Sequence, residues 1–152
     1  MIECFFELNS KPMSTFQCGH FSVPAFSGRG SHINRPASSC HAGFGPIPPG
    51  SYYIFDREVN GLVGTFRDLF VDRSEWFALY AIDGRIDDEI YCDSVKRGNF
   101  RLHPKGIRGI SEGCITVESH LDYHSIRGVI KSSHPVPVPG SALKAYGRVV
   151  VQ

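Results

Sequence analysis

The chain has 152 residues, 41% hydrophobic and 20% charged, a size and composition that suit one folded domain over residues 1–152. Its net charge is +1 and its Lys and Arg residues are scattered, which argues against binding to nucleic acid. No stretch approaches the ~18 consecutive apolar residues of a membrane span, and the N-terminus lacks the pattern of a secretory signal.

The first third of the chain predicts strands around one long irregular segment. Residues 2–8 and 15–23 are rich in β-formers and are separated by a turn signal, so we predict an antiparallel pair of strands. Residues 24–49 are interrupted by Gly and Pro, which break regular structure, and a loop of this length inside one domain is usually functional. Residues 51–57 are predicted as the strand that follows it.

The rest of the chain predicts more strands and one helix. Strands are expected over residues 62–71, 75–82, 90–92, 99–103, 114–117 and 145–151. Ser119 is a suitable N-cap for a helix over residues 121–131. The expected inner face of that helix consists of Leu121, Ser125, Ile126, Val129 and Ile130. The sequence thus predicts a mainly β domain of seven to nine strands with one or two short helices.

The chain has five cysteines, a high and odd number for one domain. They fit either two disulfides and one free thiol, or five reduced residues. We favour reduced and buried side chains for Cys4, Cys18, Cys40 and Cys92, with disulfides as the alternative in an oxidising compartment. The spacing of His32, Cys40 and His41 is not diagnostic of a metal site, and we predict no metal or other cofactor.

The strongest chemical signal is a histidine, His103, eleven positions before a cysteine, Cys114. A cysteine needs only a nearby imidazole to give up its proton and become a nucleophile. Gly113 leaves space for a substrate carbonyl, and backbone N–H groups at Gly113 and Cys114 are placed to stabilise an oxyanion. Three cations, Arg101, Lys105 and Arg108, lie close in sequence and would favour the thiolate.

The run Ser111-Glu112-Gly113-Cys114, with His103 upstream, resembles the signature of L,D-transpeptidases, and more closely that of L,D-transpeptidase-like toxins delivered by type VI secretion. Further segments similar to the toxin family lie at residues 26–30, 34–36 and 45–54. The resemblance implies a β-sandwich or barrel catalytic domain. It also implies that the substrate is a peptidoglycan stem peptide, which acylates the cysteine.

The resemblance assigns roles to individual residues. Cys114 would attack the carbonyl between the third stem residue, expected to be meso-diaminopimelate, and D-Ala at position four. His103 would handle the proton, oriented by the backbone carbonyl of Pro104, and Ser111 would hydrogen-bond within the site. The thioacyl-enzyme would pass to water, giving L,D-carboxypeptidase activity, or to a free D-amino acid, giving exchange.

Three charged residues beside the motif are the expected substrate-binding groups. Arg101 and Arg108 are candidates for holding a stem-peptide carboxylate. Glu112 stands where cross-linking L,D-transpeptidases have a second histidine, and a carboxylate near the thiol raises its pKa. This departure, together with the short segment between His103 and Cys114, favours hydrolysis and exchange over cross-linking.

As a toxin, the protein would be made in the cytoplasm without a signal peptide and act in the periplasm of a target cell. Its expected partners are a type VI secretion component and a periplasmic immunity protein that protects the producing cell. Two alternatives stand beside this interpretation. One is another Cys–His amidase or peptidase, and the other is a non-catalytic β-rich binding module whose Cys114 is structural.

Overall fold

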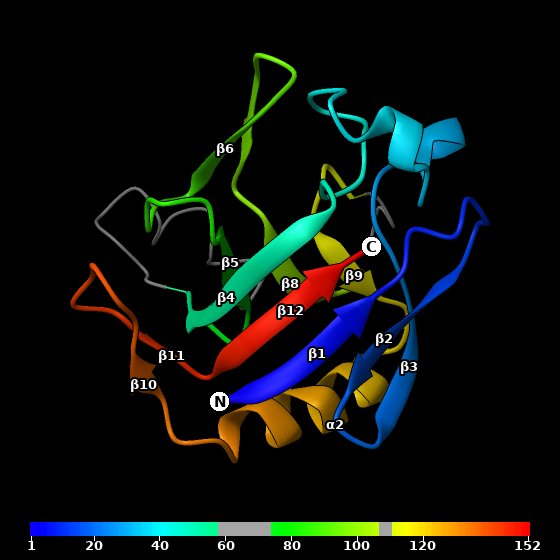
Figure 1. Cartoon of the computed structure of the whole chain (residues 1–152). Helices are drawn as coiled ribbons and strands as arrows, with labels where there is room; N and C mark the ends of the chain where they lie inside the picture. Colours follow the sequence, from blue (N-terminus) through cyan, green and yellow to red (C-terminus); the bar gives the residue numbers. More distant parts are fainter. Residues whose placement is uncertain (58–73, 107–110) are drawn as a thin grey trace.

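A computed structural model describes residues 1–57, 74–106 and 111–152 (Figure 1). Within these residues, eight strands form a closed barrel in the order β1-β12-β4-β5-β8-β9-β3-β2. Their bounds are β1 (Ile2–Phe6), β2 (Ser14–Cys18), β3 (Phe21–Phe26), β4 (Gly50–Asp56), β5 (Phe77–Ala81), β8 (Arg101–Pro104), β9 (Ile115–Val117) and β12 (Gly147–Val151). The prediction of a mainly β domain with a barrel is confirmed.

Smaller elements decorate the barrel. A hairpin of β6 (Glu89–Cys92) and β7 (Val95–Gly98) projects from the end of the molecule opposite the α-helix, as Figure 1 shows. A second pair joins β10 (Val136–Pro137) to β11 (Lys144–Ala145), and the loop after β3 carries two 3-10 turns, Gly30–His32 and Pro36–Ser38. The described residues contain one α-helix, α2 (His120–Lys131).

The barrel closes where the two ends of the chain meet. β1 runs parallel to β12, with Ile2 opposite Gly147 and Phe6 opposite Val151. A side chain at position 147 would place its Cβ 2.1 Å from the carbonyl oxygen of Ile2, so only glycine fits this register. Closure therefore depends on a residue more than 140 positions from its partner.

The alternation of side chains on β8 and β9 separates core from site. Leu102, Ile115 and Val117 are fully buried in the main hydrophobic core. Because successive side chains on a strand point to opposite faces, His103 and Thr116 point away from that core. The core also receives Tyr123, Ile126 and Ile130 from α2, which packs against β8 and β9 and so supports both site strands from below.

The structure corrects four details of the sequence prediction. Residues 15–23 are a hairpin, since the chain turns at Gly19, which has φ +60°, and β3 begins at Phe21. β7 is absent from the predicted strands, and β8 extends one residue beyond the predicted strand 99–103, with Pro104 paired to Val117. On α2, Leu121 is 80% exposed and Tyr123 takes the inner position. The strand expected at residues 62–71 lies outside the described residues.

The N-cap prediction for α2 is confirmed, because the Ser119 side chain accepts a hydrogen bond from the Asp122 N–H. In the described part of the chain, no helix is both long and apolar enough to cross a membrane.

Candidate active site

His103 and Cys114 lie on the same outward face of two neighbouring parallel strands. β8 pairs with β9 so that Leu102 faces Ile115 and His103 faces Thr116. Cys114 precedes Ile115 and therefore stands beside Arg101, on the same side of the sheet as His103. The pairing thus puts the two predicted catalytic side chains on one face of the sheet at diagonal positions, since His103 faces Thr116 and not Cys114.

The His103 ring is fixed in one tautomer. Its Nδ1 lies 2.7 Å from the Pro104 carbonyl oxygen, and a carbonyl can only accept a hydrogen bond, so Nδ1 carries the proton of the neutral ring. The Nε2 lone pair is then the basic position. The Trp76 ring stacks on the imidazole at 4.2 Å between centroids and 19° between planes, which holds the plane of the base.

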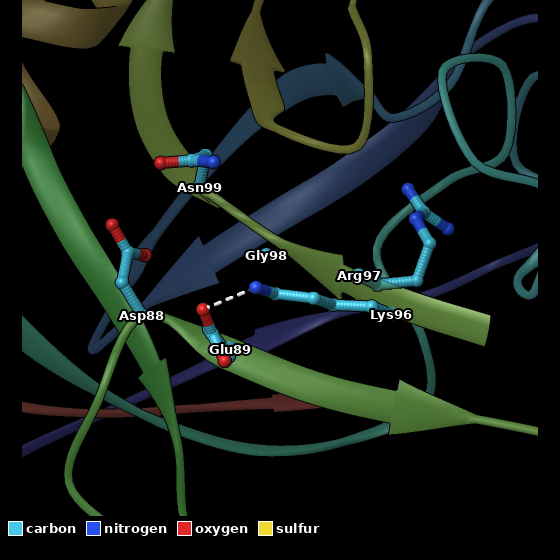
Figure 2. Close-up of a pocket in the computed structure, with 6 residues that line it drawn as sticks. All are labelled: Asp88, Glu89, Lys96, Arg97, Gly98 and Asn99. Atoms are coloured by element: carbon cyan, nitrogen blue, oxygen red, sulfur yellow. Dashed lines mark ion pairs between the residues drawn. The ribbon is translucent and has the colours of Figure 1, made fainter. Parts of the chain in front are cut away.

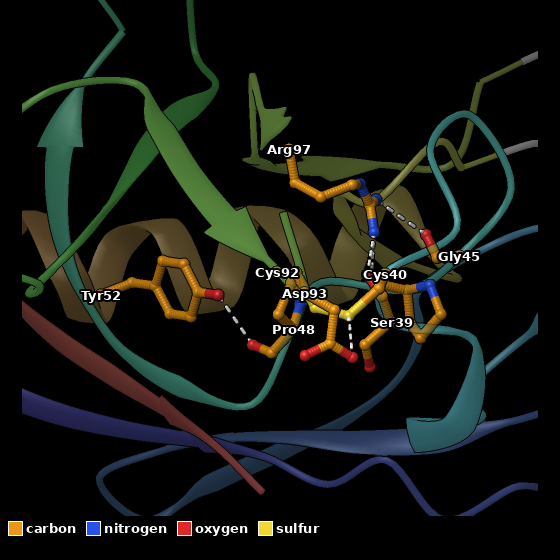
Figure 3. Close-up of a disulfide and its surroundings, with 9 residues drawn as sticks. Ser39, Cys40, Gly45, Pro48, Tyr52, Cys92, Asp93 and Arg97 are labelled. Atoms are coloured by element: carbon orange, nitrogen blue, oxygen red, sulfur yellow. Dashed lines mark hydrogen bonds between the residues drawn. A yellow bond between two sulfur atoms is a disulfide. The ribbon is translucent and has the colours of Figure 1, made fainter. Parts of the chain in front are cut away.

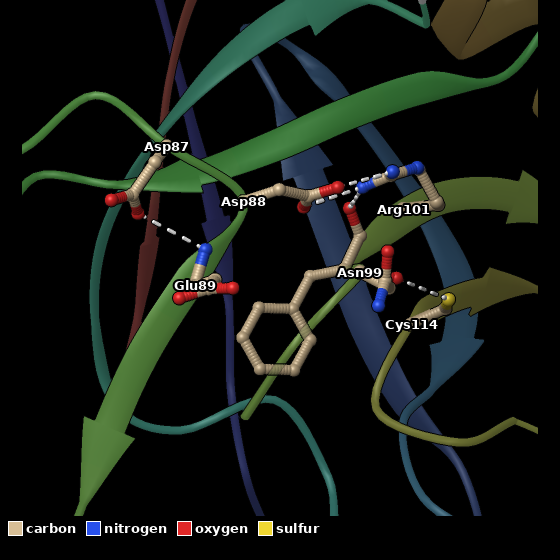
Figure 4. Close-up of polar contacts among 7 residues, drawn as sticks. Asp87, Asp88, Glu89, Asn99, Arg101 and Cys114 are labelled. Atoms are coloured by element: carbon tan, nitrogen blue, oxygen red, sulfur yellow. Dashed lines mark hydrogen bonds and ion pairs between the residues drawn. The ribbon is translucent and has the colours of Figure 1, made fainter. Parts of the chain in front are cut away.

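Cys114 is half-buried at the start of β9 (Figure 4). Its Sγ lies 3.7 Å from the carbonyl oxygen of Asn99 and donates toward it. Burial raises the pKa of the thiol to about 11, while a backbone hydrogen bond from Arg101 and its guanidinium charge oppose the rise. The carboxylates of Asp88 and Glu112 raise the pKa of the thiol further. Without substrate, the side chain is therefore a thiol at neutral pH.

The turn before the nucleophile is braced by Ser111. Its hydroxyl donates to the Cys114 carbonyl at 2.7 Å and accepts from the Gly28 N–H at 3.4 Å. Gly113 takes φ +109°, a conformation that favours glycine. Ser111 thus ties the turn to the loop after β3 and fixes the backbone that carries the thiol.

The three upstream segments singled out in the sequence pack together beside this turn. Buried Asn34 receives the Ser27 N–H on its side-chain oxygen at 2.9 Å. The Ser27 hydroxyl accepts from the Ile47 N–H at 2.8 Å. Residues 26–30, 34–36 and 45–54 are therefore one hydrogen-bonded unit, which supports Gly28 and, through it, Ser111.

The three predicted substrate-binding residues differ in their surroundings. Arg101 is held by Asp88 through two contacts of 2.8 and 2.5 Å, so its guanidinium is fixed beside the thiol by an acidic partner (Figure 4). Glu112 is exposed and pairs with Arg29 at 3.4 Å. Arg108 lies outside the described residues.

A pocket of about 290 Å³ lies at the β6–β7 hairpin (Figure 2). It is lined by Asp88, Glu89, Lys96, Arg97, Gly98 and Asn99. Asn99 connects it to the active site, because its carbonyl oxygen contacts the Cys114 thiol. Lys96 and Glu89 form an ion pair of 2.6 Å between half-exposed side chains, so the pocket offers both signs of charge.

The cysteine prediction was wrong for two residues. Cys40 and Cys92 form a disulfide that joins the 36–46 loop to β6, as Figure 3 shows. Cys4 and Cys18 are free and buried, as we favoured, and a hydrogen bond between them, with burial, raises the pKa of the Cys4 thiol. Cys40 cannot bind a metal through a disulfide sulfur, and the His32 and His41 rings lie 4.8 Å apart with 39° between their planes.

Sequence reasoning missed four residues of the site: Trp76, Asp88, Arg97 and Asn99. The partner of Asp88 is Arg101, which lies 13 residues away across a hairpin. Trp76 reaches His103 only because β5 pairs with β8. The one available signal was Asn99, which follows a glycine and takes φ +56°, a conformation that asparagine tolerates better than most residues.

A mainly β domain that presents a cysteine and a tautomer-fixed histidine on one face of two neighbouring strands is suited to acyl transfer. Comparison with protein families agrees: the model of the Tlde1 domain matches residues 22–141, more than three quarters of the chain. The chain belongs to this family, the type VI secretion effectors of the L,D-transpeptidase type, and the resemblance seen in the sequence is confirmed. No curated protein and no solved structure gave a significant match.

Proposed function

We propose that the protein is an L,D-carboxypeptidase that also exchanges the fourth residue of peptidoglycan tetrapeptide stems, through a thioester on Cys114. The observation that carries the proposal is the placement of Cys114 and His103 on one face of the β8–β9 pair, with His103 Nδ1 bound to the Pro104 carbonyl. This arrangement leaves the basic Nε2 for the proton of the thiol.

Acylation begins with a neutral pair. Because burial holds Cys114 as a thiol, His103 Nε2 takes the proton while Sγ attacks the carbonyl that links the third residue to D-Ala. Backbone N–H groups of the Gly113–Cys114 turn stabilise the oxyanion. As the intermediate collapses, the imidazolium returns its proton to the leaving amine, D-Ala departs, and a thioester remains on Cys114.

Deacylation reuses the same base. His103 removes a proton from water, which attacks the thioester and releases a tripeptide stem, or from the amine of a free D-amino acid, which forms a new peptide bond. Either route returns the proton to the thiol and regenerates the enzyme. Loss of tetrapeptide donors would starve wall cross-linking and account for toxicity.

The charged pocket beside Cys114 supports a stem residue with both an amine and a carboxylate at its side-chain end. Such a group would meet the carboxylate of Glu89 and the ammonium of Lys96, whose mutual pair is half-exposed and costs little to open. This chemistry agrees with meso-diaminopimelate as the third residue.

Family membership supports the expected partners. We propose that a type VI secretion component delivers the protein to the periplasm of a neighbouring cell, and that a periplasmic immunity protein covers the Cys114 cleft in the producer. A pull-down with Cys114→Ala as bait from a producing strain tests the second partner. Recovery of no protein that inhibits the enzyme counts against it.

The decisive experiment is a digest of intact tetrapeptide muropeptides by wild type and by Cys114→Ala, read by mass spectrometry with and without D-Met. We expect release of D-Ala and incorporation of D-Met by the wild type and neither by the variant. Intact tetrapeptides with a folded wild type would reject the L,D activity and favour another amidase, or a binding module.

A further inference from the structure

A buried arginine outside the predicted motif lies directly behind the nucleophile. Arg97, on β7, is only 5% exposed. Its guanidinium donates hydrogen bonds to three main-chain carbonyls of the loop before β4, those of Ser39, Gly45 and Pro46 (Figure 3). Among the described residues, no carboxylate pairs with it.

A buried cation satisfied only by neutral carbonyls keeps its full charge. Burial of a cation is costly, and structures usually offset the cost with an acidic partner. Arg97 instead stacks over the Phe100 ring at 5.5 Å. Such an unbalanced charge acts on whatever polar group lies next to it in the low-dielectric interior.

That neighbour is the nucleophile turn. An ideal Cβ on Gly113 would stand 2.6 Å from Arg97 Nη2 and 2.9 Å from a Phe100 ring carbon. The guanidinium therefore lies against the α-carbon of Gly113, one residue before the thiol. This contact gives a second reason for glycine at position 113, besides its positive φ.

We propose that Arg97 is a positioning residue that supports the Gly113–Cys114 turn from behind and supplies the positive charge that favours the thiolate and the oxyanion. The role is distinct from that of Arg101, whose guanidinium is neutralised by Asp88. It rests on Cys114 being the nucleophile and therefore on the proposed function.

The charges that face Cys114 come from several elements. Arg101 of β8 favours the thiolate, while Asp88, before β6, and Glu112 of the turn disfavour it. His103 shares its face of the sheet. Arg97 itself faces Tyr52 of β4 and Cys114, and both oppose the effect of burial on the arginine pKa. Arg97 adds to this balance a positive charge that lies against Gly113, the residue before the thiol.

The test measures alkylation of Cys114 by iodoacetamide, a neutral reagent, at several pH values between 8 and 10, with peptide mapping to exclude Cys4 and Cys18. Arg97→Gln keeps hydrogen bonds to the loop carbonyls, Arg97→Met keeps the packing on Phe100, and Arg97→Lys keeps the charge. Because there are two uncharged variants, Arg97→Gln and Arg97→Met, the test still works if one of them does not fold. Arg148→Gln, on β12 and paired with Glu3, is the matched control.

We expect the uncharged variants to react about tenfold more slowly than wild type at each pH, which corresponds to one pKa unit, and Arg97→Lys to stay within about threefold of it. A purely structural role of Arg97 predicts the opposite change, because loosened packing in the variants would expose the thiol and make alkylation faster. Rates in the uncharged variants equal to or faster than wild type would overturn the proposal, as would an Arg97→Lys variant as slow as Arg97→Gln.

This readout needs no stem peptide, so it separates the inference from the proposed function. If wild type releases no D-Ala, the proposed function fails while the alkylation series still tests the effect of Arg97 on the thiol. If wild type is active, the uncharged variants should lose kcat with little change in KM, because the oxyanion forms only after substrate has bound.

Discussion

At the scale of single residues, the site holds Cys114 in the protonated form. Burial raises the pKa of Cys114 to about 11, and Arg101 only partly opposes this effect. A thiol with this pKa is unreactive until a base takes its proton, so we expect the chemistry proposed for Cys114 to depend on His103 and on a bound substrate. The arrangement protects the cysteine from reaction with other electrophiles.

The raised pKa predicts the pH dependence of thiol reactivity in the substrate-free protein. Because the acid form persists to higher pH, the thiolate fraction at pH 8 should be about 100-fold below that of a cysteine with a pKa of 9. Alkylation of wild type should rise about tenfold per pH unit from pH 7 to 10. A rate that levels off below pH 9 would show that the thiol ionises far more readily than its burial implies.

Asp88 offers a substitution whose effect should be a gain of reactivity. Its carboxylate raises the pKa of Cys114 directly and neutralises Arg101. Asp88→Asn removes both effects at nearly constant size, so alkylation at pH 9 should become roughly three- to tenfold faster. Glu89→Gln is the matched control, since its carboxylate pairs with Lys96 instead. Slower alkylation of Asp88→Asn would mean that the placement of Arg101 matters more than its net charge.

The sequence revealed the residues whose chemistry is local and missed those placed by long-range pairing. Cys114, Ser111, His103 and Pro104 lie within one 12-residue segment, and the hydrogen bonds expected of Ser111 and Pro104 are present. Arg97 carries no local sign of burial, because neighbouring Lys96 is exposed and equally basic. Only the fold distinguishes Arg97 from Lys96, because it places the carbonyls of Ser39, Gly45 and Pro46 next to the Arg97 guanidinium.

At the scale of elements, the β6–β7 hairpin connects the catalytic strands to the long loop. It carries Arg97 against the Gly113 turn, and the disulfide from Cys92 anchors it to Cys40, next to Ser39, which accepts from Arg97 (Figure 3). Sequence spacing could not reveal this pairing, because the two cysteines are 52 positions apart and lie in a loop and on a hairpin. The disulfide and the Arg97 hydrogen bonds therefore both join the β6–β7 hairpin to the loop before β4.

Loss of this disulfide should destabilise the protein measurably. With a sequence separation of 52, the unfolded chain regains loop entropy worth about 2–4 kcal/mol when the bond is absent. Cys40→Ser/Cys92→Ser should therefore melt roughly 5–15 °C below wild type. A reductant should lower the Tm of wild type alone, with the double variant as its control. An equal Tm for both proteins, or an equal effect of reductant on both, would contradict the prediction.

At the scale of the whole molecule, the site strands are part of the closed barrel. β8 and β9 belong to one continuous ring of strands that is closed where β1 meets β12, so we expect them to keep their register best when both chain ends are docked. Strand positions were largely predictable because alternation and turn residues are local. The parallel closure was not, since nothing near residues 2–6 indicates that their partner is residues 147–151.

Alanine substitutions at two glycines should change the free energy of unfolding in opposite directions, one at the β1–β12 seam and one, as a control, on α2. Gly147→Ala forces a Cβ to 2.1 Å from the Ile2 carbonyl and 2.6 Å from the Ile2 side chain, so it should lower the free energy of unfolding by about 1–3 kcal/mol. Gly128→Ala lies on the exposed side of α2 with no atom within 4 Å of its Cβ, so it should raise that free energy by about 0.5–1 kcal/mol.

Urea unfolding of both variants measures these changes, and amide hydrogen exchange locates them. In Gly147→Ala, protection should fall first in β1 and β12 and then in β8 and β9, because opening the seam frees the ring on both sides. Undisturbed protection in β8 and β9 would mean that these site strands are held by α2 and the core alone. Closure would then serve stability without governing the position of Cys114.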